Sequence, residues 1–121
     1  SFDETVEALR KSAPANDWHI PDERDLTGLW AEEGVESPPK IRVIYLCNAH
    51  GGHAITKDDE LKAMSVMMPM GLSIYETSKG QVEISFMNLG MMSAMFVGTT
   101  HDVLKASAQN LENALKDVVE Q

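Results

Sequence analysis

The stretch GLSIYETSKGQVEISFMN, residues 71–88, constrains the fold more than any other part of the chain. It consists of two runs of alternating apolar and polar residues on either side of a short polar turn that contains Gly80. Alternation with a period of two is typical of strands that bury one face, and a short glycine-containing turn lets such strands pair antiparallel. The stretch therefore predicts a β-hairpin and, with it, an antiparallel sheet.

Both ends of the chain predict amphipathic helices. Residues 1–13 place apolar side chains three or four positions apart, and their first letters, SFDE, have the form of a capping box. A longer helix is predicted from Thr99 or Thr100, either of which suits its N-cap, to about Val119. One apolar stripe runs along this helix and consists of Leu104, Ala108, Leu111, Leu115 and Val118.

The segment between the first helix and the hairpin mixes strands and helices. A short extended segment is predicted around residues 18–20, where a proline-containing polar stretch ends the first helix. A short helix is predicted over residues 26–33, with Asp25 as its cap and Gly34 as its stop. Residues 40–47, KIRVIYLC, are rich in β-branched and aromatic side chains and predict a strand.

A further helix is predicted from the end of that strand, after Cys47, to about Leu61, and the pair Gly51-Gly52 can delay its start by a few residues. The resulting order of elements is typical of an α+β fold. We expect a single small, largely antiparallel sheet with helices packed on one face and a long C-terminal helix. A chain of this length forms one domain, residues 1–121.

The charge of the chain excludes some classes of partner. The formal net charge is −9, whereas a surface that binds nucleic acid needs clustered Lys and Arg, and anionic membranes attract basic segments. No apolar run approaches the roughly 20 residues that span a bilayer. We therefore expect no nucleic acid partner and no membrane span, and the composition is compatible with a cytoplasmic or an exported protein.

The stretch LCNAHGGH, residues 46–53, points most directly to chemistry. It contains Cys47, the only cysteine of the chain, together with His50 and His53. If a helical turn follows the strand, both histidines lie on one face of it and can converge with the thiol on a metal ion. Cysteine with two histidines and an open position suits zinc. Two other interpretations stay open: a reactive thiol beside basic residues, and a buried, inert cysteine with solvated histidines.

Methionine is unusually frequent, with eight residues in 121. Four of them precede the hairpin and three follow it; they are Met64, Met67, Met68 and Met70, then Met91, Met92 and Met95. Core packing is the default interpretation, because the flexible methionine side chain fills irregular gaps. A methionine-lined pocket or a partner surface is the alternative.

Four parts of the chain together resemble a known family. They are the opening SFDETVEALRKSA, the strand IRVIYLCNA, the segment MMPMGLSIYE…GQVEISFMN and the closing helix. They are similar to the family of domain of unknown function 302, which implies a compact α+β domain that often packs as a dimer and supplies no activity. Ala49 stands where the family often has proline, and Met70 where many members have a second cysteine, so a two-thiol redox pair is unavailable.

The resemblance also implies that the MMPM segment returns beside the strand that ends at Cys47. Met70 then becomes a fourth ligand beside Cys47, His50 and His53, and such a set suits copper. The chain contains no P-loop, no G-x-S-x-G and no H-E-x-x-H motif, so we expect a binding domain rather than an enzyme. The most concrete hypothesis is copper handling or electron transfer, with zinc as the alternative metal. The competing hypotheses are a homodimeric interaction module with an incidental cysteine and a thiol-dependent sulfur carrier or enzyme.

Overall fold

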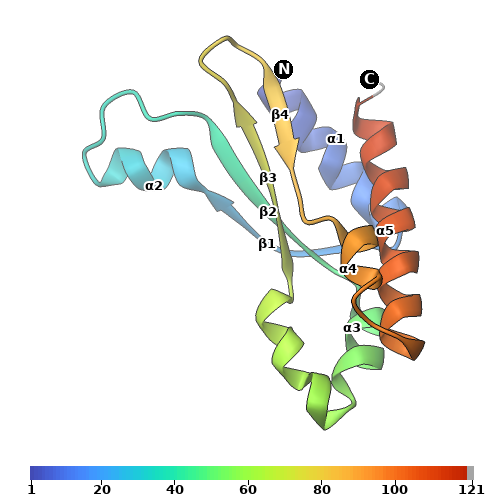
Figure 1. Cartoon of the computed structure of the whole chain (residues 1–121). Coiled ribbons are helices and arrows are strands. Elements are labelled where there is room, and N and C mark those ends of the chain that lie inside the picture. The colour runs from blue at the N-terminus through green and yellow to red at the C-terminus, as the bar shows by residue number, and fades with distance from the viewer. Residues whose placement is uncertain (120–121) are drawn as a thin grey trace.

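The computed structural model describes residues 1–119 and consists of one four-stranded antiparallel sheet with helices packed on one face (Figure 1). The strands follow one another across the sheet in chain order; they are β1 (His19–Asp25), β2 (Ile41–Cys47), β3 (Met70–Glu76) and β4 (Val82–Ser85). The helices are α1 (Phe2–Ala15), α2 (Leu26–Glu32), α3 (Ala49–Thr56), the 3-10 helix η1 (Asp59–Met67), α4 (Leu89–Ser93) and α5 (Gly98–Val119). The predicted α+β class, the hairpin and the long C-terminal helix are confirmed.

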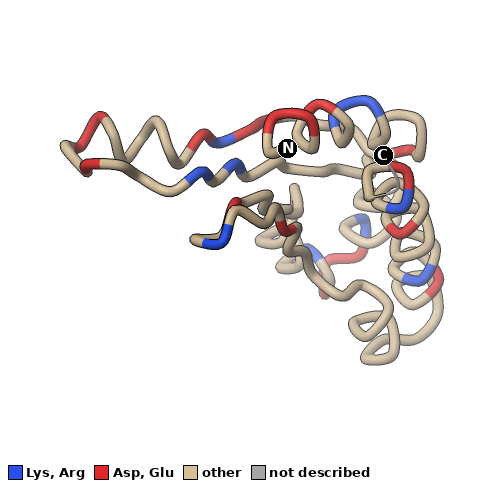
Figure 2. Tube along the Cα trace, turned by 90° about the horizontal axis from the view of Figure 1, so that it is seen from above, with Lys and Arg blue, Asp and Glu red and all other residues tan. Residues whose placement is uncertain are grey.

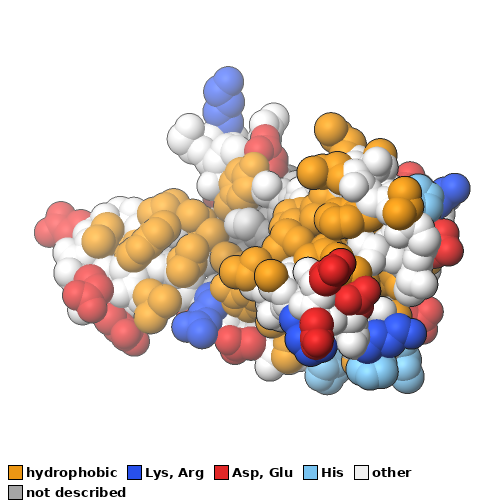
Figure 3. All heavy atoms as spheres, turned by 60° about the horizontal axis from the view of Figure 1, so that its bottom comes forward, with side chains coloured by type: hydrophobic (Ala, Val, Ile, Leu, Met, Phe, Trp, Pro, Cys, Tyr) orange, Lys and Arg blue, Asp and Glu red, His pale blue; other side chains and the backbone are white. Residues whose placement is uncertain are grey.

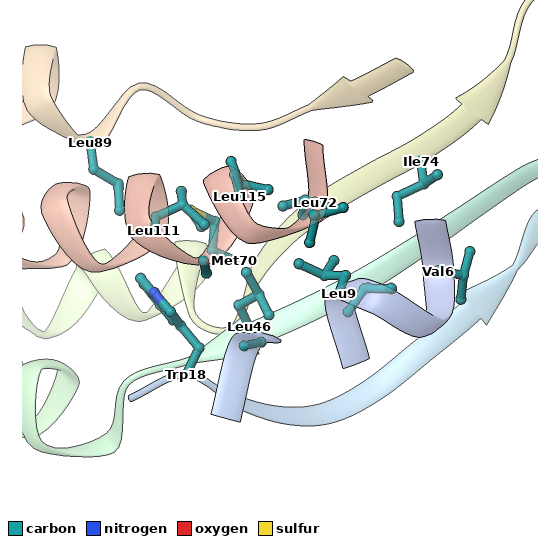
Figure 4. Close-up of a cluster of buried hydrophobic side chains, with 14 of the residues drawn as sticks. Val6, Leu9, Trp18, Leu46, Met70, Leu72, Ile74, Leu89, Leu111 and Leu115 are labelled. Carbon is teal, nitrogen blue, oxygen red and sulfur yellow. The ribbon is translucent and has the colours of Figure 1, made fainter. Parts of the chain in front are cut away.

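The core lies between the sheet and the helices α1 and α5 (Figure 4). Ile44 and Leu46 of β2 and Leu72 of β3 are at most 1% exposed, and they alternate with less buried neighbours along their strands. Leu9 of α1 and the apolar stripe of α5 pack on this face. The helices cover this face only. The side chains at the alternate positions of each strand point to the other face of the sheet.

The first and last helices do not begin and end at all the predicted residues. The first helix extends to Ala15, and the Ser1 hydroxyl accepts a hydrogen bond from the Glu4 amide at 3.3 Å, as its capping box predicts. The last helix begins at Gly98, so the prediction that Thr99 or Thr100 caps it was wrong. Gly98 has a φ of +63°, a conformation that glycine adopts without strain, and it turns the chain directly into the helix.

The helix that follows Cys47 is shorter than predicted. It begins at Ala49, before the glycine pair, because the Asn48 side chain caps it by accepting from the Gly51 amide at 3.1 Å. It ends at Thr56 rather than near Leu61. The Asp58 carboxylate then accepts from the Glu60 amide at 3.1 Å and starts the separate helix η1, so one predicted helix is two.

Helix α2 and the adjoining ends of β1 and β2 project from the rest of the molecule (Figure 1). We call residues 24–42 the arm. Asp25 caps α2 by accepting from the Gly28 amide at 3.1 Å, and Gly34 follows it with a φ of +84°, as predicted. All of α2 lies in the described part of the chain, and none of its residues is buried. The arm has no core of its own: strand pairing holds its two ends, and the Thr27 hydroxyl ties α2 to β2 by donating to the Pro39 carbonyl at 2.8 Å and accepting from the Ile41 amide at 2.9 Å.

Charged side chains of both signs are interspersed along the described chain (Figure 2). One ion pair fastens β1 to α1: the Arg10 guanidinium donates to both carboxylate oxygens of Glu23, with Nε and Nη2 each at 2.9 Å from one of them. The hydrogen bond to Glu23 raises the pKa of Arg10 above its ordinary value. Within residues 1–119 no helix is long and apolar enough to cross a membrane.

Candidate binding site

An apolar cavity of about 80 Å³ lies where β2, α3, η1, β3 and α5 meet. We call it the methionine pocket, because six of the eight methionines and the only cysteine line it. These residues are Cys47, Met64, Met67, Met68, Met70, Met87 and Met92. A pocket that gathers most of the sulfur of the chain agrees with the methionine-lined alternative, and Met87 is a member that the sequence analysis did not single out.

Strand pairing places Cys47 and Met70 within one residue of each other, although alternation along β2 turns the Cys47 side chain to the opposite face from Leu46 and Met70. Strands β2 and β3 are antiparallel, and their register pairs Leu46 with Met70, so Cys47 lies one residue beyond the partner of Met70. Met70 is 6% exposed and Cys47 is half-buried. Figure 4 shows the Met70 side chain extending from β3 toward Leu111 on α5. Two of the four predicted ligands, Cys47 and Met70, therefore line the same pocket.

Helix α3 forms one wall of the pocket through the glycine pair and Ile55. A Cβ atom on Gly52 would lie 3.5 Å from the Met68 sulfur, and one on Gly51 would lie 3.0 Å from Cγ1 of Val103 on α5. The absence of a side chain at Gly51 lets α3 lie close to α5, whereas a Cβ atom on Gly52 would make only an ordinary van der Waals contact. Gly51 thus has a packing role, which only its spatial neighbours reveal.

The two histidines lie outside the pocket. His50 and His53 are one turn apart on α3 and both are exposed, on the side of the helix away from Gly51, Gly52 and Ile55. Figure 3 shows histidine side chains at the surface of the molecule. Over residues 1–119, no three His, Cys, Asp or Glu side chains are grouped so that they could hold a metal ion. The three-residue spacing of the motif predicted that His50 and His53 converge with Cys47. In the structure both imidazoles lie on the exposed side of α3, outside the pocket that Cys47 lines.

Trp18 lines the pocket, and its indole nitrogen is a buried polar atom that the open space of the pocket does not reach. The residue immediately before β1 is 5% exposed and lines the pocket, and its neighbour His19 pairs with Cys47 across β1 and β2. No acceptor in the described chain pairs with the Trp18 Nε1–H. A buried donor without an acceptor costs about 1–3 kcal/mol. The sequence predicted only that residues 18–20 are extended, and it did not predict that Trp18 lines a pocket.

The side chains that line the pocket support few kinds of chemistry. Within the described residues, the pocket wall contains no Asp, Glu, Lys, Arg or His. It offers one thiol, several thioethers and apolar surface, with Asn48 and Ser107 as polar side chains. Thiolate and thioether sulfur prefer soft metals such as Cu(I), and an apolar cavity also suits small uncharged molecules. Binding, rather than proton transfer between paired acids and bases, is the chemistry that these groups support.

Comparison with known proteins identifies the fold without assigning a ligand. The sequence profile of the family described as Domain of unknown function DUF302 matches residues 1–121. The crystal structure of uncharacterized conserved protein DUF302 from Bacillus stearothermophilus superposes with a TM-score of 0.81, covering 97% of this chain and 90% of that chain. The two sequences are 17% identical, so the likeness concerns the fold alone. No curated protein matches the chain.

Proposed function

The chain belongs to the family of domain of unknown function DUF302, and from this premise and the geometry of the methionine pocket we propose that it binds monovalent copper. Cys47 and Met70 are the central ligands, and other methionines of the pocket complete the coordination. The single observation that carries the proposal is that six of eight methionines and the only cysteine line one cavity. The role is then copper handling or electron transfer by a small binding domain.

The type of donor favours Cu(I) over the alternative, zinc. Structural zinc sites draw on cysteine, histidine and carboxylate, and thioethers are poor ligands for zinc. Cys47 is the only such donor in the pocket, because His50 and His53 lie on the exposed side of α3. Methionine and cysteine are the soft ligands that select Cu(I). The proposal therefore keeps Cys47 and Met70 from the predicted ligand set and replaces the two histidines with thioethers.

Close packing alone does not account for this arrangement. Protein interiors are packed to the density of organic crystals, and methionine usually serves to fill gaps. Here the methionines line a pocket of about 80 Å³ that is partly open to solvent. Met64, Met67 and Met68 are also only half-buried, so they can reorient around an incoming ion.

A titration of the metal-free, reduced protein under anaerobic conditions tests the proposal. We expect one Cu(I) per chain, bound in competition with a chromogenic Cu(I) chelator, and weak or absent binding of Zn(II). The double variant His50→Ala/His53→Ala should bind Cu(I) as tightly as wild type, because neither side chain lines the pocket. Loss of Cu(I) binding in the double variant would instead restore the histidines to the ligand set, and no Cu(I) binding by wild type would exclude the function.

The arm favours a second role, as a contact between two copies of the chain. Leu29 and Val35 on the arm are 44% and 47% exposed, and none of the α2 residues is buried. Figure 3 shows hydrophobic side chains gathered along the arm. Short helices depend on packing for their stability, and a second copy placed against α2 would supply it. The homodimer hypothesis from the sequence placed the interface on a methionine-rich surface; the arm is a different surface for the same association.

Sedimentation velocity at increasing concentration tests the dimer. We expect reversible association that Leu29→Glu weakens, because the substitution places a charge on the proposed contact. Val66→Glu is the matched control, since Val66 is 87% exposed on η1, outside the arm. A wild-type protein that stays monomeric at every concentration, or equal weakening by both substitutions, would rule out the arm as the interface.

A further inference from the structure

A groove of about 1090 Å³ lies between β4 and the helices α1, α4 and α5. We call it the edge groove. Its lining includes apolar residues of β4 and α5, which are Val82, Ile84, Leu111, Leu115 and Val118. Phe86, which directly follows β4, also lines it and is 49% exposed. The edge groove therefore leaves apolar surface uncovered beside β4.

Strand β4 is an edge strand, because the sheet runs in the order β1-β2-β3-β4 (Figure 1). The Thr77 amide donates to the Gln81 carbonyl at 2.8 Å, and this bond fixes which residues of β4 face β3. Since such residues alternate along an antiparallel strand, Glu83 directs its backbone groups to β3, and Val82 and Ile84 direct theirs to the free edge. Within residues 1–119, no backbone hydrogen bond from another element reaches this edge.

The opposite edge of the sheet is protected against pairing, whereas β4 is not. Pro21 of β1 lacks an amide hydrogen, and the register of β1 with β2 shifts between His19 and Asp22. Residues 81–86 contain no proline, and the register of β4 with β3 is unbroken. A regular, unprotected edge is a template for another extended chain.

We propose that β4 binds an extended segment of a partner protein, which pairs with it antiparallel as a fifth strand. Antiparallel pairing is the mode of the whole sheet and is slightly more stable per residue than parallel pairing. The segment alternates apolar and basic residues. Its apolar side chains enter the edge groove beside Val82, Ile84 and Phe86, and its basic side chains lie on the other face of the sheet. This binding does not depend on the metal.

The charge of β4 argues for a basic partner. Glu83 is exposed on the face of the sheet opposite to the edge groove, and its carboxylate accepts a hydrogen bond from the Tyr75 hydroxyl at 3.0 Å. No cation of the described chain forms an ion pair with Glu83. Opposite charges on neighbouring strands stabilise a sheet. A second copy of the chain would bring a further net charge of −9 to this edge, which disfavours it as the occupant.

The probe is the labelled peptide Lys-Val-Lys-Ile-Lys-Val-Lys, titrated into the protein by fluorescence anisotropy. Lys-Lys-Val-Ile-Val-Lys-Lys has the same composition without the alternation. In antiparallel pairing the apolar residues of the probe direct their amides to β4, and the lysines direct theirs away. A peptide N-methylated at the apolar residues therefore cannot pair, and a peptide N-methylated at the internal lysines is its matched control.

We expect the alternating peptide to bind saturably and to slow hydrogen exchange at the Val82 and Ile84 amides. N-methylation at its apolar residues should weaken binding by about tenfold or more, because several hydrogen bonds are lost, and N-methylation at its lysines should have no effect. The variant Glu83→Lys should weaken binding about two- to fivefold, the range of one cross-strand charge pair. Glu36→Lys makes the same charge change at an exposed position of the arm and should bind like wild type.

Absence of binding, equal binding of the scrambled peptide, or equal effects of the two N-methylated peptides would overturn the inference. Protection of the Val82 amide that rises with protein concentration in the absence of peptide would also overturn it, because a second copy would then cover the edge. The peptide comparisons use the wild-type protein, so they stand even if Glu83→Lys fails to fold.

Discussion

Replacing Cys47 with serine is expected to weaken Cu(I) binding by more than about 100-fold, because even residues that only position a ligand typically contribute 10- to 100-fold. Cys47 is the only thiol of the chain and lines the methionine pocket with six thioethers. Serine keeps the size of the side chain but replaces a soft, anionic ligand with a hard, neutral one. The thioethers that remain are weaker ligands, because they carry no charge. The measurement is the competition titration against a chromogenic chelator.

Two methionine variants serve as the matched comparison. Met70→Leu removes a buried thioether next to Cys47 in the β2–β3 register and should weaken Cu(I) binding by less than Cys47→Ser does. Met91→Leu removes a thioether that is 72% exposed and does not line the pocket, and it should have no effect. If Cys47→Ser binds Cu(I) like wild type, or if Met91→Leu weakens binding as much as Met70→Leu, the proposed site is incorrect.

Replacing Leu72 with alanine is expected to lower the free energy of unfolding by about 3–5 kcal/mol, the cost of a large-to-small change in a rigid core. Leu72 is fully buried in β3, pairs with the equally buried Ile44 in β2, and lies beneath the helices. Its neighbours come from both strands and helices, so they cannot all move to fill the space. Domains of this size are stable by only about 5–15 kcal/mol, so the loss is a large part of the total. Urea denaturation measures it.

The control for this prediction is Val97→Ala. Val97 is 89% exposed between α4 and α5, so its truncation should change the free energy of unfolding by less than about 0.5 kcal/mol. Comparable destabilisation by the two substitutions would mean that the buried face of the sheet is not the principal core of the domain.

The parts of the fold that were predicted correctly depend on short-range patterns. The alternation around Gly80 predicted the β3–β4 hairpin, and SFDE and Asp25 predicted the starts of α1 and α2. In each case the residues that decide the conformation are within a few positions of one another. Periodicity also predicted the buried stripe of α5, of which Leu104, Leu111, Leu115 and Val118 are at most 7% exposed.

The predictions that failed concern alternatives of nearly equal local energy. Thr99 and Thr100 are good caps, but Gly98 starts the helix before them. The segment between Thr56 and Leu61 has acceptable helix propensity, but Asp58 caps a new 3-10 helix there. Such choices differ by roughly 1 kcal/mol, so the packing of the surrounding chain can reverse them.

The candidate site shows the same limit more clearly. The motif around Cys47 is local, and its spacing correctly brought His50 and His53 to one side of α3. Which side of that helix faces the protein depends on how α3 packs against α5, which is distant in sequence. These contacts turn the glycines inward and the histidines outward.

Local order along the chain was therefore sufficient for β2, for the hairpin of β3 and β4, for the main helical stripes and for the family of this protein, whereas β1 extends to Asp25, beyond the segment around residues 18–20 that was predicted. The methionine pocket required the folded chain, because Trp18, Cys47, Met70 and Met92 come from four separate segments. Their meeting depends on the register of β2 with β3 and on the packing of α3 against α5. Periodicity specifies which face of an element is apolar, whereas only the simultaneous burial of all such faces specifies which side chains share a cavity.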